Sequence, residues 1–178
     1  MSKIKIQGTI IGESDSKPYF IGEIGINHNG SVEIAKQIID LAVETGVDAV
    51  KFQKRTPEIC VPMEVRDRIR ETPWGEMTYF EYKKRIEFEK AEYDEIDAYC
   101  KEKNIPWTAS CWDLPSLDFI EKYDVAFHKI PSAKLTDKEL LRAYKETGKP
   151  VILSVGMSTE DEIEKAVAIF GENYPLSI

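Results

Sequence analysis

Short apolar runs alternate with amphipathic segments along most of this chain, and the alternation predicts parallel βαβ units. We expect strands at 19–26, 49–53, 107–112, 126–131, 151–155 and 175–178. Helices are expected between them, over 31–46, 90–103, 114–123, 136–148 and 159–171. Residues 3–12 alternate apolar and polar positions around Gly8 and predict a separate N-terminal β-hairpin. The pattern therefore predicts an α/β fold, either an open doubly wound sheet or part of a barrel.

Local signals predict several helix ends. Ser31 has the character of an N-cap for the first helix, and Gly46 would end it. Capping boxes are expected at two later helix starts, Thr136 with Glu139 and Thr159 with Glu162. The buried face of the first helix is expected to carry Ile34, Ile38, Leu41 and Ala42.

One connection is much longer than the others and runs from Lys54 to about Glu89. Structureless loops of that length are uncommon in compact domains and are usually functional or partly structured. This one contains the aromatic residues Trp74, Tyr79, Phe80 and Tyr82. We therefore expect it to pack as a lid or a partner surface, with an ordinary surface excursion as the alternative.

Composition and charge narrow the class of protein. The 178 residues are 42% hydrophobic and carry a net charge of −8, which argues against a general nucleic-acid binder. The three cysteines form no CxxC pair, so a disulfide framework and a thiolate zinc site are not supported, and a reducing cytoplasm fits best. The N-terminus has no apolar run typical of a signal peptide, and no run approaches the ~20 residues that span a bilayer. We expect a cytoplasmic protein with neither a membrane nor a nucleic acid as partner.

Three predicted strands carry a polar residue near the carboxyl end, namely Lys51, Lys129 and Ser154. A lysine in a buried strand is costly unless an anion meets it, so two of them favour one negatively charged ligand held from several strands. Each lysine could instead be a strand-end side chain that extends to solvent. Ser154 leads into a helix N-terminus, where backbone N–H groups favour phosphate, although the same residues could only cap the helix.

Strand alternation groups some of these side chains and separates others. Lys51 and Gln53 share one face of their strand, whereas Lys129 and Ser132 do not. Pro131 lacks a ladder donor and would end the strand, so that Ser132 could turn inward.

Other polar positions are more ambiguous. Glu23 lies in an apolar strand, where a carboxylate needs a partner, either a core lysine or a hydroxylated ligand. His28, in the turn that follows, is more readily structural than a metal ligand, and with two histidines in the chain a complete metal site is not expected. Cys111, which follows Ser110, is expected to be a buried thiol rather than a nucleophile, because the sequence shows no base beside it.

Four segments occur in one order along nearly the whole chain: FIGEIGINHNGSVEIAKQIIDLA, GVDAVKFQ, FIEKYDVAFHKIPSAKLTD and TGKPVILSVGMSTEDEIEKAV. Together they resemble the N-acetylneuraminate (sialic acid) synthase family, which includes legionaminate and pseudaminate synthases and spore-coat polysaccharide relatives. The resemblance implies a TIM (β/α)₈-type barrel, here only its N-terminal part, truncated after about five βα units. Residues 1–178 would form one incomplete domain, with the hairpin at 1–13 and a long excursion at 54–89.

The resemblance implies a transferase that condenses phosphoenolpyruvate with an N-acylmannosamine-type sugar aldehyde, giving a nonulosonic acid and phosphate. Matched by motif, the catalytic residues would be Glu23, Lys51 and Lys129. The substrate-binding residues would be Gln53, Ser110, Ser132, Lys134 and Ser154. Lys134 stands where the family often has a glutamate near the sugar, which bears on sugar specificity.

The resemblance also implies a divalent metal, manganese or magnesium, for the full-length enzyme, with ligands on later strands outside this chain. A homo-oligomer is expected, and open sheet edges predict self-association. We expect the chain to be catalytically incomplete by itself. The alternatives are a 3-deoxy-sugar-acid-type phosphoenolpyruvate aldolase and a non-catalytic anion-binding module. The aldolase would need extra arginines to bind a second phosphate.

Overall fold

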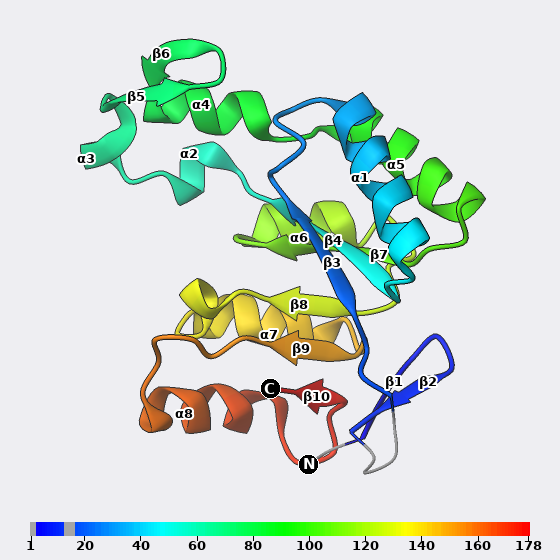
Figure 1. Ribbon diagram of the computed structural model, residues 1–178. Coiled ribbons are helices and arrows are strands. Elements are labelled where there is room, and N and C mark those ends of the chain that lie inside the picture. Colours follow the sequence, from blue (N-terminus) through cyan, green and yellow to red (C-terminus); the bar gives the residue numbers. More distant parts are fainter. Residues whose placement is uncertain (1–2, 13–16) are drawn as a thin grey trace.

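Parallel strands follow one another in chain order across the molecule, which the computed structural model describes for residues 3–12 and 17–178 (Figure 1). One three-stranded sheet consists of β3 (Ile21–Gly25), β4 (Ala49–Lys54) and β7 (Trp107–Cys111). The other consists of β8 (His128–Ile130), β9 (Val151–Leu153) and β10 (Leu176–Ser177). Thr108 Oγ1 donates a 2.7 Å hydrogen bond to the Phe127 carbonyl and so links β7 to the start of β8. Each predicted strand is confirmed, most with shorter bounds, and the order is that of a barrel wall opened at one side.

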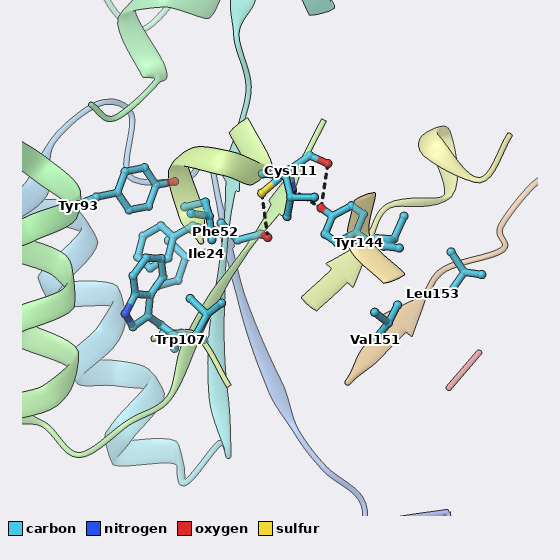
Figure 2. Close-up of a cluster of buried hydrophobic side chains, with 14 of the residues drawn as sticks. Ile24, Phe52, Tyr93, Trp107, Cys111, Tyr144, Val151 and Leu153 are labelled. Atoms are coloured by element: carbon cyan, nitrogen blue, oxygen red, sulfur yellow. Dashed lines mark hydrogen bonds between the residues drawn. The ribbon is translucent and has the colours of Figure 1, made fainter. Parts of the chain in front are cut away.

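A helix follows most of the strands, as the βα rhythm predicts. These are α1 (Val32–Thr45), α5 (Lys90–Glu102), α6 (Leu114–Ile120), α7 (Lys138–Glu146) and α8 (Glu160–Phe170). A short 3-10 helix, η1 (Ser132–Lys134), lies between β8 and α7. The main core fills the space between strands and helices, where Phe52 and Trp107 meet Tyr93 of α5 edge-on and face-on (Figure 2). The opposite face of the strands is left for polar side chains.

Helix α1 has the predicted ends but only part of the predicted face. Ser31 Oγ accepts a hydrogen bond from Ile34 N, and Gly46 closes the helix with φ +74°. The buried residues are Ala35, Ile39 and Ala42. Ala42 is buried and Ile38 packs partly buried against the core, as expected, but the prediction is wrong for Ile34 and Leu41, which are 37% and 59% exposed. The expected and the observed buried residues both recur every three to four positions, so spacing alone does not separate them. The alanines of the observed face let the helix approach the sheet closely, which bulkier residues would prevent.

The start of α7 is a second correction. Asp137 is the N-cap residue, and its Oδ1 accepts a 3.2 Å hydrogen bond from Leu140 N. The expected capping box of Thr136 with Glu139 is therefore wrong by one residue. Both Thr and Asp are good N-caps, and η1, which ends only at Lys134, delays the helix. The capping box of Thr159 with Glu162 at the start of α8 is confirmed.

The long connection is largely structured. It contains α2 (Pro57–Cys60), α3 (Met63–Arg66), an antiparallel hairpin of β5 (Ile69–Thr72) and β6 (Gly75–Thr78), and α4 (Tyr79–Ile86). Figure 1 shows this excursion beyond the carboxyl end of β4. Its aromatic rings contact cations of the excursion itself, for example Arg85 over Trp74 at 4.3 Å and Arg66 over Phe80 at 4.8 Å. Its role as a lid or partner surface stays a prediction.

The N-terminal hairpin is confirmed within the described residues. β1 (Ile4–Ile6) pairs antiparallel with β2 (Thr9–Ile11), and Ile4 and Ile6 form a small second core with Ala49 and Phe127. Positions 1, 2 and 13 of the predicted hairpin lie outside the described residues. Across 3–12 and 17–178, no helix has both the length and the apolar character needed to cross a membrane.

Candidate active site

Lys51 is the buried centre of the polar face. Its Nζ lies 2.9 Å from Glu23 Oε2 on the neighbouring strand and donates 3.3 Å hydrogen bonds to Ser110 Oγ and to the Phe52 carbonyl. The strand register explains this arrangement, because Glu23 pairs with Lys51 and Gln53 pairs with Ser110. The Lys51 side chain is 3% exposed and that of Glu23 is 60% exposed. The ammonium therefore lies at the bottom of the site, and the carboxylate lies on the side that faces solvent.

Lys129 of β8 belongs to the same site. Burial lowers its pKa below the usual value for lysine, the positive charge of Lys51 lowers the pKa further, and the negative charge of Glu23 opposes both. Two ammonium groups thus act on each other, and the carboxylate of Glu23 acts on both. A small polyanion would relieve this repulsion, because opposite charges within a few ångströms favour the charged form of each group.

The remaining predicted residues lie at the carboxyl ends of the strands. Gln53 shares the face of Lys51, with Nε2 3.5 Å from the point where a side chain on Gly25 would begin. Ser132 is the first residue of η1, and its Oγ lies 3.8 Å from the corresponding point on Gly156 in the loop after β9. Ser154 follows β9 directly, and its backbone N donates a 3.0 Å hydrogen bond to the Ile130 carbonyl. Ser132 and Ser154 therefore follow the carboxyl ends of the paired strands β8 and β9.

Lys134 has a different partner from the other predicted site residues. Its Nζ lies 3.4 Å from Asp137 Oδ2 at the start of α7. Its charge also acts on Cys60, whose Sγ lies 3.0 Å from Asp113 Oδ2. Burial, with Asp113, raises the pKa of the Cys60 thiol to about 12, and Lys134 only partly opposes this. Lys134 is therefore paired with the start of α7 rather than with Lys51 or Glu23.

Several buried charges at the end of β4 were not identified from the sequence. Lys54 Nζ donates to the Phe88 carbonyl at 2.7 Å and lies 3.3 Å from Glu89. Arg55 Nε lies 2.7 Å from Glu87 Oε1, and the Arg55 backbone N donates to Glu87 Oε2. Burial raises the pKa of Glu87 even though Arg55 opposes it. These contacts attach the end of the excursion to β4, and continued alternation from Lys51 was the signal that could have drawn attention to Arg55.

The described residues do not fit a divalent metal. His28 stacks on Phe88 with ring centroids 3.9 Å apart, and its Nδ1 accepts a hydrogen bond from Gly30 N. Burial lowers the pKa of His28 to about 4. Cys111 is fully buried, and burial raises its thiol pKa well above the usual value. Over residues 3–12 and 17–178, no three His, Cys, Asp or Glu side chains gather as metal ligands would.

Known proteins share both sequence and fold with this chain. The N-acetylneuraminate-9-phosphate synthase of Drosophila melanogaster is 37% identical over 166 residues, which are 92% of this chain and 44% of that protein. The crystal structure of N-acetylneuraminic acid (sialic acid) synthetase from Leptospira borgpetersenii serovar Hardjo-bovis in complex with citrate has a TM-score of 0.82 and 30% identity, over 98% of this chain and 57% of that one.

A third comparison concerns the fold alone. A truncated form of 3-deoxy-D-arabino-heptulosonate 7-phosphate synthase from Thermotoga maritima has a TM-score of 0.68 at 13% identity, over 98% of this chain and 54% of that one. The two solved structures are TIM barrels, so the expected α/β architecture is confirmed over about half of such a barrel. The chain spans about half the length of the curated relatives it matches.

The sequence pattern of the NeuB family matches residues 38–177, which include β4, β7, β8 and β9 and the polar residues at their ends. The resemblance inferred from four short motifs is confirmed by this match. The chain therefore belongs to the NeuB family.

Proposed function

We propose that the protein binds phosphoenolpyruvate at the polar face of β3, β4, β7 and β8, as part of a synthase that condenses it with an N-acylmannosamine-type sugar. The observation that carries the proposal is the pair of lysines, Lys51 and Lys129, on one face with a single half-exposed carboxylate, Glu23. Phosphoenolpyruvate brings a phosphate and a carboxylate, and ammonium and hydroxyl donors suit both. Ser110, Ser132 and Ser154 supply such hydroxyls at or just beyond the carboxyl ends of β7, β8 and β9.

The proposed reaction balances with one water. A carbon–carbon bond forms between the enolic carbon of phosphoenolpyruvate and the aldehyde carbon of the sugar, and the aldehyde oxygen takes up a proton. Water adds to the resulting cation, and the tetrahedral intermediate then loses phosphate. Glu23 and Gln53, which face the open side of the Lys51 site, would contact the sugar and the reacting centre. The lysines would hold the charge that the phosphate group carries away.

A divalent metal, manganese or magnesium, remains part of the proposal for the full-length enzyme. Residues 3–12 and 17–178 form no ligand set for it, so its ligands would come from other residues. The Drosophila relative is an N-acetylneuraminate-9-phosphate synthase, which makes the charge of the acceptor sugar the open variable of the proposal. Cytoplasmic location and a homo-oligomeric state also remain proposals.

Isothermal titration calorimetry with phosphoenolpyruvate tests the function. We expect saturable binding to the protein, a loss of at least tenfold in affinity for Lys51→Met and for Lys129→Met, and no change for Lys90→Met. Lys90 is the control because it is an exposed lysine on α5 whose partner, Asp94, is on the same helix. Absence of binding to the wild-type protein, or equal affinity of all three variants, would refute the proposal.

A second candidate is a non-catalytic anion-binding module. It is supported by the same two lysines, Lys51 and Lys129, which would hold an anion whether or not a reaction follows. A phosphate-release assay with phosphoenolpyruvate, N-acetylmannosamine and manganese separates the two. Turnover supports the synthase, whereas binding without turnover supports the module for the chain as given. The 3-deoxy-sugar-acid aldolase alternative shares only the fold with this chain, at 13% identity.

A further inference from the structure

Two buried N–H donors meet at the rim of the candidate active site, and neither has a hydrogen-bond acceptor among the described residues. They are Arg55 Nη2 and Trp112 Nε1. The Arg55 guanidinium carbon lies over the Trp112 ring, 5.5 Å from its centroid. Arg55 is 7% exposed, whereas Trp112 is partly exposed, so the pair lies just beneath the surface of the rim. Buried donors without acceptors are rare and costly, so two in contact indicate a place for ligand oxygens.

The position of the pair relates it to the phosphoenolpyruvate residues. Arg55 and Trp112 directly follow β4 and β7, and the parallel ladder extends to them through a 3.1 Å hydrogen bond from Trp112 N to the Lys54 carbonyl. Alternation assigns Arg55 to the side of Lys51 and Gln53. At about 3.3 Å per residue, Arg55 lies roughly 7 Å beyond Gln53 and 13 Å beyond Lys51 along the strand direction. The donor pair is therefore one layer farther out than the residues proposed to meet the reacting centre.

Basic side chains lie near the pair, together with two carboxylates, Glu87 and Asp113, of which Asp113 accepts hydrogen bonds from Thr56 N and Oγ1. Glu87, 2.7 Å from Arg55 Nε, balances the charge of that guanidinium only. Lys83 and Arg70 contact the ring of Tyr79 at 5.1 and 4.9 Å. Burial and the nearby charge of Arg55 lower the pKa of Lys83 to about 8, Glu87 opposes this, and Arg70 adds to it. Donors without acceptors, near basic side chains, favour an anionic oxygen over a neutral hydroxyl.

A purely structural role explains only part of this arrangement. The edge of Arg55 that carries Nε, together with its backbone N, binds Glu87 and anchors the end of α4. The anchoring role makes no use of Nη2, and the contact with the guanidinium uses the face of the Trp112 ring rather than its N–H. The two unused donors therefore need a separate explanation.

We propose that Arg55 and Trp112 bind an anionic group, a phosphate or a carboxylate, at the end of the acceptor sugar that lies farthest from its aldehyde. This inference rests on the proposed function, because that function places the aldehyde next to Gln53 and the Lys51 site. Arg55 is then the arginine that recognises a second anionic group, and the pair selects a charged acceptor over a neutral one.

Calorimetry at saturating phosphoenolpyruvate tests the inference with N-acetylmannosamine, its 6-phosphate and the corresponding uronic acid. We expect one of the charged sugars to bind at least tenfold more tightly than the neutral sugar. Trp112→Phe keeps an aromatic ring and removes one donor, and should weaken binding of the charged sugar at least tenfold, because a hydrogen bond to a charged group is lost. Arg55→Lys should weaken it similarly, and neither change should affect the neutral sugar.

Controls separate binding from folding. Trp107→Phe removes an indole from the opposite face of β7, where Nε1 donates to Asp97, and should lower the Tm without changing the preference for a charged sugar. Trp112→Phe should lower the Tm less than Trp107→Phe does, because a ring remains under the Arg55 guanidinium and the Trp112 N–H has no acceptor among the described residues. Equal affinity for charged and neutral sugars, or an unchanged affinity in Trp112→Phe, would overturn the inference. Trp112-dependent binding of inorganic phosphate that the charged sugar does not displace would also overturn it.

The same calorimetry tests the proposed function independently of the donor pair. Phosphoenolpyruvate is titrated alone, and its binding should be lost in Lys51→Met and retained in Trp112→Phe. If phosphoenolpyruvate binds but charged sugars are not preferred, only the inference about Arg55 and Trp112 is refuted. Absence of phosphoenolpyruvate binding refutes the function and the inference with it.

Discussion

Glu23 and Lys51 occupy paired positions on adjacent parallel strands, and their charged atoms lie 2.9 Å apart with the carboxylate on the solvent side. The ammonium is almost fully enclosed, so Glu23 is its principal counter-charge in the described structure. This geometry gives Lys51 two alternative partners, the protein carboxylate or an anionic ligand that enters from the open side. Stability and ligand binding are therefore coupled at this pair.

Glu23→Gln should reveal that coupling. The change leaves the buried ammonium with only neutral acceptors, Ser110 Oγ and the Phe52 carbonyl. Because Glu23 is largely solvated, we expect a loss of about 1 kcal/mol in the free energy of unfolding rather than the larger cost of a fully buried pair. Phosphoenolpyruvate should then raise the Tm more in the variant than in the wild-type protein, since it replaces the missing charge.

Urea denaturation with and without phosphoenolpyruvate measures both effects. Glu95→Gln is the matched control, because Glu95 pairs with Lys36 on the helix surface. An exposed pair contributes little, so this variant should change neither stability nor the effect of the ligand. If Glu23→Gln is as stable as the control, Lys51 does not depend on Glu23.

Lys129→Met should stabilise the fold while it abolishes phosphoenolpyruvate binding. Burial and Lys51 lower the pKa of Lys129, so the unfolded chain binds the proton more tightly than the folded chain. The cost of the charge is present in full at neutral pH, and stability rises with pH between the lowered pKa and about 10.5. Methionine removes that cost, and we expect a rise of roughly 2 °C in Tm.

The pH dependence provides a second measurement on the same variant. Thermal unfolding of the wild-type protein should show a gain in stability in the alkaline range that Lys129→Met lacks. Lys138→Met, at an exposed position at the start of α7, should keep the wild-type profile. A lower Tm for Lys129→Met than for Lys138→Met would mean that Lys129 stabilises the fold, contrary to the argument.

The strands and their polar ends were predictable because the signals are local. Buried strands are continuous apolar runs, such as Ala49–Val50, and a lysine within such a run stands out at once. The caps at Ser31 and Thr159 were predictable for the same reason, since each lies within three residues of its partner. These local features also carry the four motifs on which the family resemblance depended.

The features that could not be predicted depend on packing between distant segments. Glu87 binds Arg55 across 32 residues, and the sequence does not say which of many acidic residues meets it. Whether α1 buries Ala35 or Ile34 depends on how closely the helix approaches the sheet. The choice of Asp137 over Thr136 depends on where η1 ends. Each decision is made by tertiary contacts between candidates that local propensity ranks almost equally.

Acid should destabilise the protein through His28. Burial lowers the pKa of His28 to about 4, against about 6.5 in an unfolded chain, so the unfolded state takes up the proton first as pH falls. The corresponding stability is present above pH 6.5 and is lost between pH 6.5 and 4, up to about 3 kcal/mol. His28→Gln should flatten this part of the pH profile. Urea denaturation at pH 7, 5.5 and 4.5 measures the difference, and parallel profiles for both proteins would contradict the assignment to His28.

Gly30→Ala should be the most damaging alanine substitution in the turn between β3 and α1. Gly30 has φ +70°, and a Cβ there would overlap the backbone carbonyl oxygen of Arg85 at the end of α4, which cannot move aside as a side chain can. Gly46→Ala is the matched control, with φ +74° and no atom within 4 Å of the added carbon. The control isolates the cost of the left-handed backbone, about 1 kcal/mol, so Gly30→Ala should lose at least about 2 kcal/mol more through the steric overlap. The close approach of Gly30 to Arg85 connects the first βα turn to the excursion. An added methyl group would push the two apart, so limited proteolysis should cut the segment 57–89 faster in Gly30→Ala than in Gly46→Ala. Equal stability of the two variants would show that the turn and α4 do not pack as closely as described.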